Sequence, residues 1–156
     1  MTIAQAGMLT FLGNAFATFF FTAVIWYTQI LGYPLWRWVG DCEFHALHSE
    51  YLRRLPAVVQ VPYAFLLASN LLLYHWRPAA VSMGMVSVLL FLNVSVLAVS
   101  VALAGPIHTH FQDAGKCPPA KMQKLLAYNA VRMLLMVASS GVVSYLLFKM
   151  LITHGK

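Results

Sequence analysis

The sequence predicts an all-α integral membrane protein: a four-helix bundle with an extra interfacial helix or helical extension between the first two spanning helices. Hydrophobic residues make up 61% of the 156 residues and charged residues only 9%, whereas soluble domains carry about 25% charged residues. Four apolar stretches are each long enough to cross a bilayer, which takes about 20 helical residues. Only helices or closed barrels satisfy backbone polar groups in lipid, and stretches this continuous are typical of helices.

The apolar stretches predict where each spanning helix lies within one transmembrane domain, residues 1–156. We expect the helices at about residues 8–31, 57–74, 79–104 and 125–152. A tight turn joins the second helix to the third, whereas the polar loops 32–56 and 105–124 are long. In an up-down bundle both long loops lie at one membrane face.

Neither long loop is expected to be shapeless. Residues 41–55 contain no Gly or Pro and are bounded by Gly40 and Pro56, which predicts an interfacial helix or an extension of the second spanning helix. Pro106 is expected to kink the third helix rather than end it. His108 and His110 would then stand on a helical extension.

Lys and Arg are divided unequally between the two faces. The long loops hold six of them and the opposite face holds three: Arg37, Arg53, Arg54, Lys116, Lys121 and Lys124, against Arg77, Lys149 and Lys156. The positive-inside rule then places the long loops in the cytoplasm and both termini outside. Charges scattered around apolar stretches are typical of membrane topology and give no indication of a nucleic-acid partner.

The two cysteines, Cys42 and Cys117, lie in the long loops. In the cytoplasm they would stay reduced, whereas an oxidising compartment would allow them to pair. Two cysteines alone do not decide between these alternatives.

Four of the six histidines fall in the two long loops: His45 and His48 in the first, His108 and His110 in the second. On a helix, Asp41, His45 and His48 share one face. Neutral imidazole suits Fe, Cu and Zn, so one or two histidines from each loop would make a three- or four-ligand non-haem metal site. A bis-histidine haem is the second choice. The alternative is a solvated polar surface that happens to contain histidine.

Asn129 and Arg132 lie one turn apart in the fourth helix. An ionised Arg within a span usually faces the bundle interior or a polar cavity, although one near a helix end can extend to the interface. The first orientation would place a positive charge beneath the histidines, where it could bind an anionic or phenolate substrate.

Other polar and aromatic residues have plainer expected roles. Asn14, Asn70 and Asn93 are predicted to form hydrogen bonds between helices. Tyr33, Trp36 and Trp38 are expected to form an aromatic belt at the membrane surface.

The order of these motifs resembles a known group. His45 and His48 before the second helix, Pro106-Ile107-His108 after the third, and Asn129-x-x-Arg132 in the fourth resemble the small four-helix membrane proteins of unknown function that include the fungal anthrone oxygenases. The resemblance implies oxidation of a polycyclic phenolic substrate by molecular oxygen, with His48, His108, Asn129 and Arg132 as the site. Many bacterial members have Trp and Thr where this chain has Ala130 and Met133.

The sequence therefore predicts a membrane oxidoreductase, of the oxygenase type, with a His-lined site at one end of the bundle. The substrate would be a hydrophobic phenol or another small apolar molecule. Either a bound metal or a histidine acting as general base would supply the chemistry. The alternative is a non-catalytic membrane subunit that packs in a larger complex or homo-oligomer.

Overall fold

The computed structural model describes residues 2–154, and every regular element in that range is helical. The elements in chain order are α1 (Ile3–Tyr27), η1 (Thr28–Gly32), α2 (Tyr33–Leu35), η2 (Trp36–Trp38), α3 (Asp41–Leu55), η3 (Pro56–Gln60), α4 (Val61–Leu72), α5 (Met83–Val99), η4 (Ser100–Ala104), α6 (Gly105–Ala114) and α7 (Pro119–His154). Of the short elements, η1, η3 and η4 are π-helical and η2 is a 3₁₀ turn.

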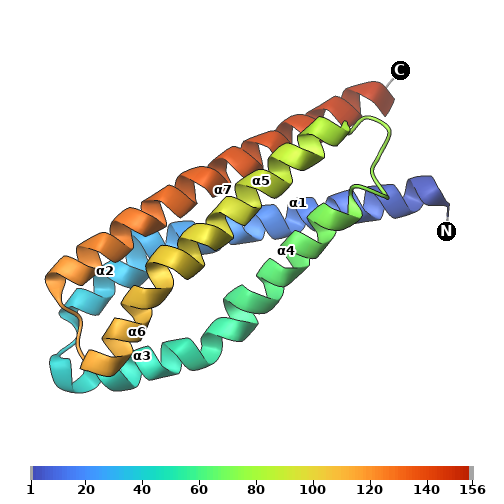
Figure 1. Ribbon diagram of the computed structural model, residues 1–156. Coiled ribbons are helices and arrows are strands. Elements are labelled where there is room, and N and C mark those ends of the chain that lie inside the picture. Colours follow the sequence, from blue (N-terminus) through green and yellow to red (C-terminus); the bar gives the residue numbers. More distant parts are fainter. Residues whose placement is uncertain (1, 155–156) are drawn as a thin grey trace.

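These elements join end to end into four long helices, Ile3–Trp38, Asp41–Leu72, Met83–Ala114 and Pro119–Ile152, each apolar and long enough to cross a membrane. The predicted all-α four-helix membrane protein is thereby confirmed. Both termini and the connection between α4 and α5 lie at one end of the bundle, and α2, α3 and α6 lie at the other (Figure 1). We refer to these as the terminal end and the site end.

The two long polar segments, residues 32–56 and 105–124, are mostly helical. Asp41–Leu55 extends the second spanning helix, and Gly105–Ala114 extends the third through Pro106. Both extensions are among the expected alternatives. The apolar runs marked only the hydrocarbon-spanning part of each helix, because polar residues continue the helices beyond it. True turns remain near Gly40 and at Gly115, whose φ of 60° ends α6 in the left-handed region where glycine has no Cβ penalty.

Each π-helical segment has a proline two residues beyond its end: Pro34, Pro62 and Pro106. In a regular α-helix a proline ring clashes with the carbonyl four residues earlier. That carbonyl belongs to the middle residue of each π segment, Ile30, Val58 or Ala102. The wider π turn thus lets these helices pass a proline without breaking.

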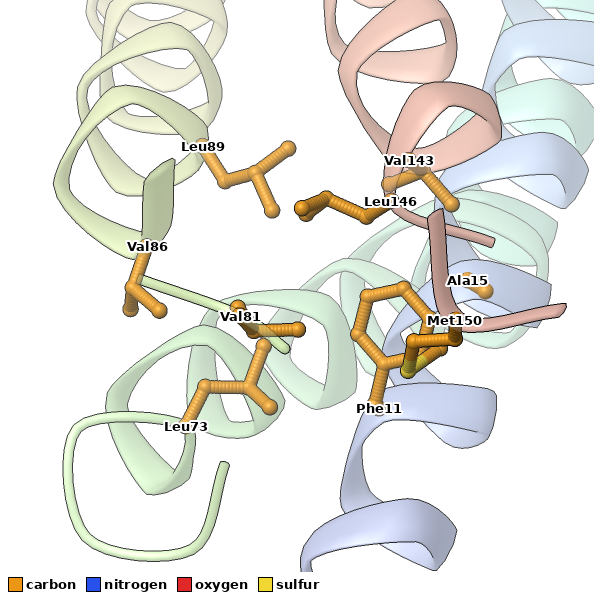
Figure 2. Close-up of a cluster of buried hydrophobic side chains, with 9 residues drawn as sticks. All are labelled: Phe11, Ala15, Leu73, Val81, Val86, Leu89, Val143, Leu146 and Met150. Carbon is orange, nitrogen blue, oxygen red and sulfur yellow. The ribbon is translucent and has the colours of Figure 1, made fainter. Parts of the chain in front are cut away.

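The interior divides into three apolar clusters along the bundle axis. The cluster at the terminal end gathers side chains from α1, α5, α7 and the α4–α5 connection around Phe11 (Figure 2). A middle cluster surrounds Phe21 and Met136. The cluster at the site end is built around Trp36, Phe44 and Phe111.

A polar layer separates the terminal-end cluster from the middle one. Its members are buried and come from all four spanning helices: Asn14, Ser69, Asn70, Asn93 and Ser139. The Asn14 side chain donates to Ser69 Oγ across α1 and α4 at 2.9 Å, and Ser139 donates to Asn93 Oδ1 across α7 and α5 at 3.2 Å. The predicted interhelical role is confirmed for Asn14 and Asn93, whereas Asn70 donates to the Leu66 carbonyl of its own helix.

Candidate functional site

The centre of the site end is a pair of histidines from two helices. His48 of α3 and His108 of α6 are joined by a hydrogen bond of 3.2 Å between His48 Nε2 and His108 Nδ1. Their rings stack with centroids 5.5 Å apart. His48 is buried and His108 is half-buried. The two histidines that the resemblance implies for the site are therefore direct neighbours.

The hydrogen bonds around this pair define how its protons are arranged. His48 Nδ1 lies 3.0 Å from Gln112 Oε1, which can only accept, so Nδ1 carries the proton. Gln112 is oriented in turn by its amide nitrogen, which donates to Ser49 Oγ at 2.9 Å. With His48 neutral, its Nε2 accepts from His108 Nδ1–H. The remaining ring nitrogen, His108 Nε2, is then an unprotonated base.

Aromatic side chains enclose the two imidazoles. Tyr51 stacks on His108 with a centroid distance of 5.6 Å, and Phe44 stacks on His48 at 5.7 Å. Trp36 contacts both rings edge-on. This packing leaves the imidazoles little freedom to rotate. It therefore keeps the hydrogen bonds from Gln112 through His48 to His108 aligned.

A cavity of about 720 Å³ lies beside His108. Its wall includes residues of all four spanning helices and is mostly apolar, with side chains such as Phe21, Leu67 and Val96. All three π segments contribute to it: Thr28 from η1, Val59 and Gln60 from η3, and Ser100, Val101 and Ala104 from η4. The irregular turns thus surround the space that they help to open.

Arg132 of α7 lines the same cavity. The side chain is half-buried, and its Nε is fully buried without a hydrogen-bond partner. Within residues 2–154 no carboxylate forms an ion pair with it, although Asp113 also lines the cavity. A guanidinium in an apolar wall without a counter-charge is suited to an anionic or strongly polar ligand group.

Asn129 lies one turn from Arg132 but does not line the cavity. It is fully buried, and its amide nitrogen donates to Gln29 Oε1 at 2.9 Å and to the Ile25 carbonyl at 3.3 Å. These bonds tie α7 to α1 at the start of η1. The position indicates that Asn129 holds the backbone around the cavity rather than contacting a ligand there.

His45 and His110 stay apart from the central pair. His45 is exposed and packs beside Gly115, and His110 is only partly covered and has no resolved bond to His48 or His108. Among the described residues no three His, Cys, Asp or Glu side chains form a group that could hold a metal. The three- or four-ligand metal site expected from His45, His48, His108 and His110 is therefore not assembled, because α3 buries the face carrying Phe44 and His48 and turns His45 outward.

Several residues of the site were missed or misread in the sequence. Gln112 lies one turn after His108, and that spacing was the available signal for its role. Tyr33 and Trp36 were expected in a surface belt, but they are only 2% and 8% exposed and pack against the histidines. Trp38, at 87% exposure, is the one that faces outward as expected.

The two cysteines are free thiols in the structure. Cys42 is exposed at the start of α3, and Cys117 is half-buried in the turn between α6 and α7. Burial raises the pKa of the Cys117 thiol, an effect partly offset by the nearby Arg37. The two thiols therefore differ in their exposure.

The site thus consists of an oriented imidazole base and an unpaired guanidinium on the wall of an apolar cavity. A function for this chain has to be argued from this geometry. The order of motifs in the sequence shows only a resemblance to a known group. Comparisons with protein-family models, curated proteins and solved structures gave no match to this chain.

Proposed function

We propose that this chain is a membrane oxidoreductase of the oxygenase type, which oxidises a hydrophobic phenolic substrate with molecular oxygen. The observation that carries the proposal is that His108, a base held by hydrogen bonds, and Arg132, a cation without a counter-ion, line one apolar cavity. The motif order that resembles the anthrone oxygenase group favours the same chemistry.

Binding follows from the cavity and its cation. A volume of about 720 Å³ lies within the range of roughly 300–1,000 Å³ that is usual for small-molecule sites. The apolar wall would cover the rings of the substrate. The guanidinium of Arg132 would bind its phenolic or keto oxygen, which becomes negative when the substrate loses a proton.

Proton removal is the task of His108. Its Nε2 would take a proton from the acidic methylene of the keto tautomer, giving an enolate that Arg132 stabilises. His48 and Gln112 keep the proton on His108 Nδ1, so that Nε2 stays the basic atom. Of these residues, His108 and Arg132 would contact the substrate, and His48 would be a positioning residue.

The redox step needs oxygen as the oxidant. The enolate carbon forms a bond to O₂, and the imidazolium of His108 returns its proton to give a hydroperoxide. Loss of the second hydrogen from that carbon, with cleavage of the O–O bond, releases water and leaves a carbonyl. Overall a CH₂ group and O₂ become C=O and H₂O, so the carbon loses four electrons and oxygen gains four.

The test is oxygen uptake by the purified protein with anthrone as the probe. We expect one O₂ consumed per anthraquinone formed, at a rate above that of heat-denatured protein. Arg132→Gln should lower the rate by about 100-fold, because it removes one charged group that stabilises the developing anion. The matched control is Arg77→Gln at the terminal end, where the Arg77 side chain is exposed.

Two outcomes would overturn the proposal: no protein-dependent oxygen uptake, or an Arg132→Gln variant as fast as the unmodified chain. Absence of uptake together with co-purification in a larger assembly would support the alternative role of a non-catalytic subunit.

The proposal includes a sidedness. The six Lys and Arg residues at the site end favour the cytoplasm for that end, with both termini outside. Cys42 is exposed there, so a membrane-impermeant maleimide should modify it in inverted vesicles and not in intact cells. Modification in intact cells would reverse the orientation.

A further inference from the structure

A second cavity, of about 410 Å³, adjoins the first. The two cavities share five wall residues: Val24, Thr28, Tyr51, Leu55 and Val59. These residues come from the last turns of α1, the start of η1, the end of α3, and η3. The two spaces are therefore separated only by the side chains where the first spanning helix meets the second.

The remaining wall of the second cavity faces outward. Phe20, Ala23, Tyr27, Arg54 and Val58 line this cavity and not the first, and all five are exposed. Apart from Tyr27 and Arg54 they are apolar. Since these positions belong to helices apolar enough to span a membrane, the second cavity opens sideways toward lipid tails, with Arg54 at its polar edge.

The shared wall combines half-buried side chains with irregular backbone. Tyr51 and Val59 pack against the neighbouring apolar clusters, and Val24, Thr28 and Leu55 complete the wall. Thr28 and Val59 belong to π segments, where the backbone hydrogen-bond pattern departs from the α-helix. π segments are also frequent at functional sites.

Resting on the function proposed above, we propose that the substrate is a phenolic lipid. Its head would lie in the first cavity at Arg132 and His108, and its apolar tail would pass between α1 and η3 into the second cavity. A compact tail-less molecule would leave the outward space unused. A tailed molecule needs apolar space beyond its head, and the second cavity, which shares a wall with the first, supplies it.

The test compares two phenols with the same head, 4-methylphenol and 4-decylphenol, by equilibrium binding to the full chain in lipid nanodiscs. Ala23→Phe fills part of the second cavity without touching the first. We expect it to weaken 4-decylphenol binding by about tenfold or more, as overfilling a packed space does, and to leave 4-methylphenol binding unchanged. The matched control is Ala138→Phe, at an exposed position on α7 that lines neither cavity.

A second variant guards against a local folding defect at Ala23. Val58→Trp narrows the same space from the opposite helix and should reproduce the selective loss. Equal loss for both phenols, or none for either in both variants, would overturn the tail position.

The outcomes also separate this inference from the proposed function. In one outcome, 4-methylphenol binds, Arg132→Gln abolishes that binding, and neither Ala23→Phe nor Val58→Trp changes the affinity for 4-decylphenol. Only the phenolic-lipid inference then fails. If neither phenol binds the unmodified chain, the proposed function and this inference fail together.

Discussion

The two ends of this bundle are made from similar apolar helices but differ in how they are filled. At the terminal end, α1, α5 and α7 are regular, and nine buried side chains fill the space between them (Figure 2). At the site end, three of the four spanning helices contain a π segment, and a cavity lies between them.

The difference shows that backbone geometry decides where the bundle opens. The helices with a π segment are those with a proline at a fixed distance beyond it, whereas α7 has Pro119 only at its first residue. Arg132 therefore stands on an uninterrupted helix, opposite a wall of irregular ones. The rigid helix carries the charge, and the irregular helices shape the space in front of it.

The largest effect is expected from removing the base at the site end. His108→Gln should lower the oxidation rate by about 1,000-fold, within the range for loss of a general base. Its melting temperature should stay close to that of the unmodified chain, because glutamine is similar in size and its amide nitrogen can donate to His48 Nε2 in place of His108 Nδ1–H. The matched control is His75→Gln, an exposed histidine at the terminal end. Oxygen uptake and thermal unfolding measure both, and retained activity in His108→Gln would contradict the assigned role.

At the terminal end the expected effect is on stability alone. Leu89 is fully buried in the packed cluster, so Leu89→Ala should lower the free energy of unfolding by about 3 kcal/mol. Leu134→Ala, at a 66% exposed position, should change it little. Denaturation in detergent measures the difference. Substrate binding by Leu89→Ala should be unaltered, and a changed affinity would show that the two ends are coupled.

The third prediction concerns His48, which acts through His108. His48→Phe keeps an aromatic ring against Trp36 and Phe44 but removes the acceptor of the His108 proton. The turnover rate should fall by about 10- to 100-fold, as for loss of a hydrogen bond to a group that becomes charged, with little change in KM. In a double variant with His108→Gln, His48→Phe should lower the turnover rate no further than His108→Gln does alone. Additive effects would contradict a positioning role.

The smallest expected effect concerns the two thiols. Because burial raises the pKa of Cys117, its reactive thiolate fraction is low at neutral pH and grows as pH rises. Alkylation of Cys117 by N-ethylmaleimide should therefore be severalfold slower than that of exposed Cys42 at pH 7, and should accelerate toward pH 9. Mass spectrometry of Cys42→Ser and Cys117→Ser variants separates the two rates. Equal rates at pH 7 would show that the α6–α7 turn is open.

The sequence was sufficient for the fold and for the end of the bundle at which the histidines gather. Long apolar runs reveal spanning helices, and an up-down topology brings His48 and His108 to one end. The sequence did not reveal which histidines turn inward, since that depends on helix phase. Phe44, His48 and Tyr51 form the inward stripe of α3 and leave His45 outside. The cavity could not be predicted from hydrophobic periodicity either, because it results from irregular backbone near the prolines.

The π segments also set the rotational phase of everything that follows them. A π turn holds one residue more than an α turn, so it acts like a one-residue insertion and rotates the rest of the helix by about 100°. His108 follows η4 by only four residues. Pro106→Ala together with deletion of Ala102 would turn η4 into a regular α-helix with one residue fewer. His108 should then keep its present orientation toward His48. Pro106→Ala alone, if η4 relaxed to an α-helix, would swing His108 away from His48.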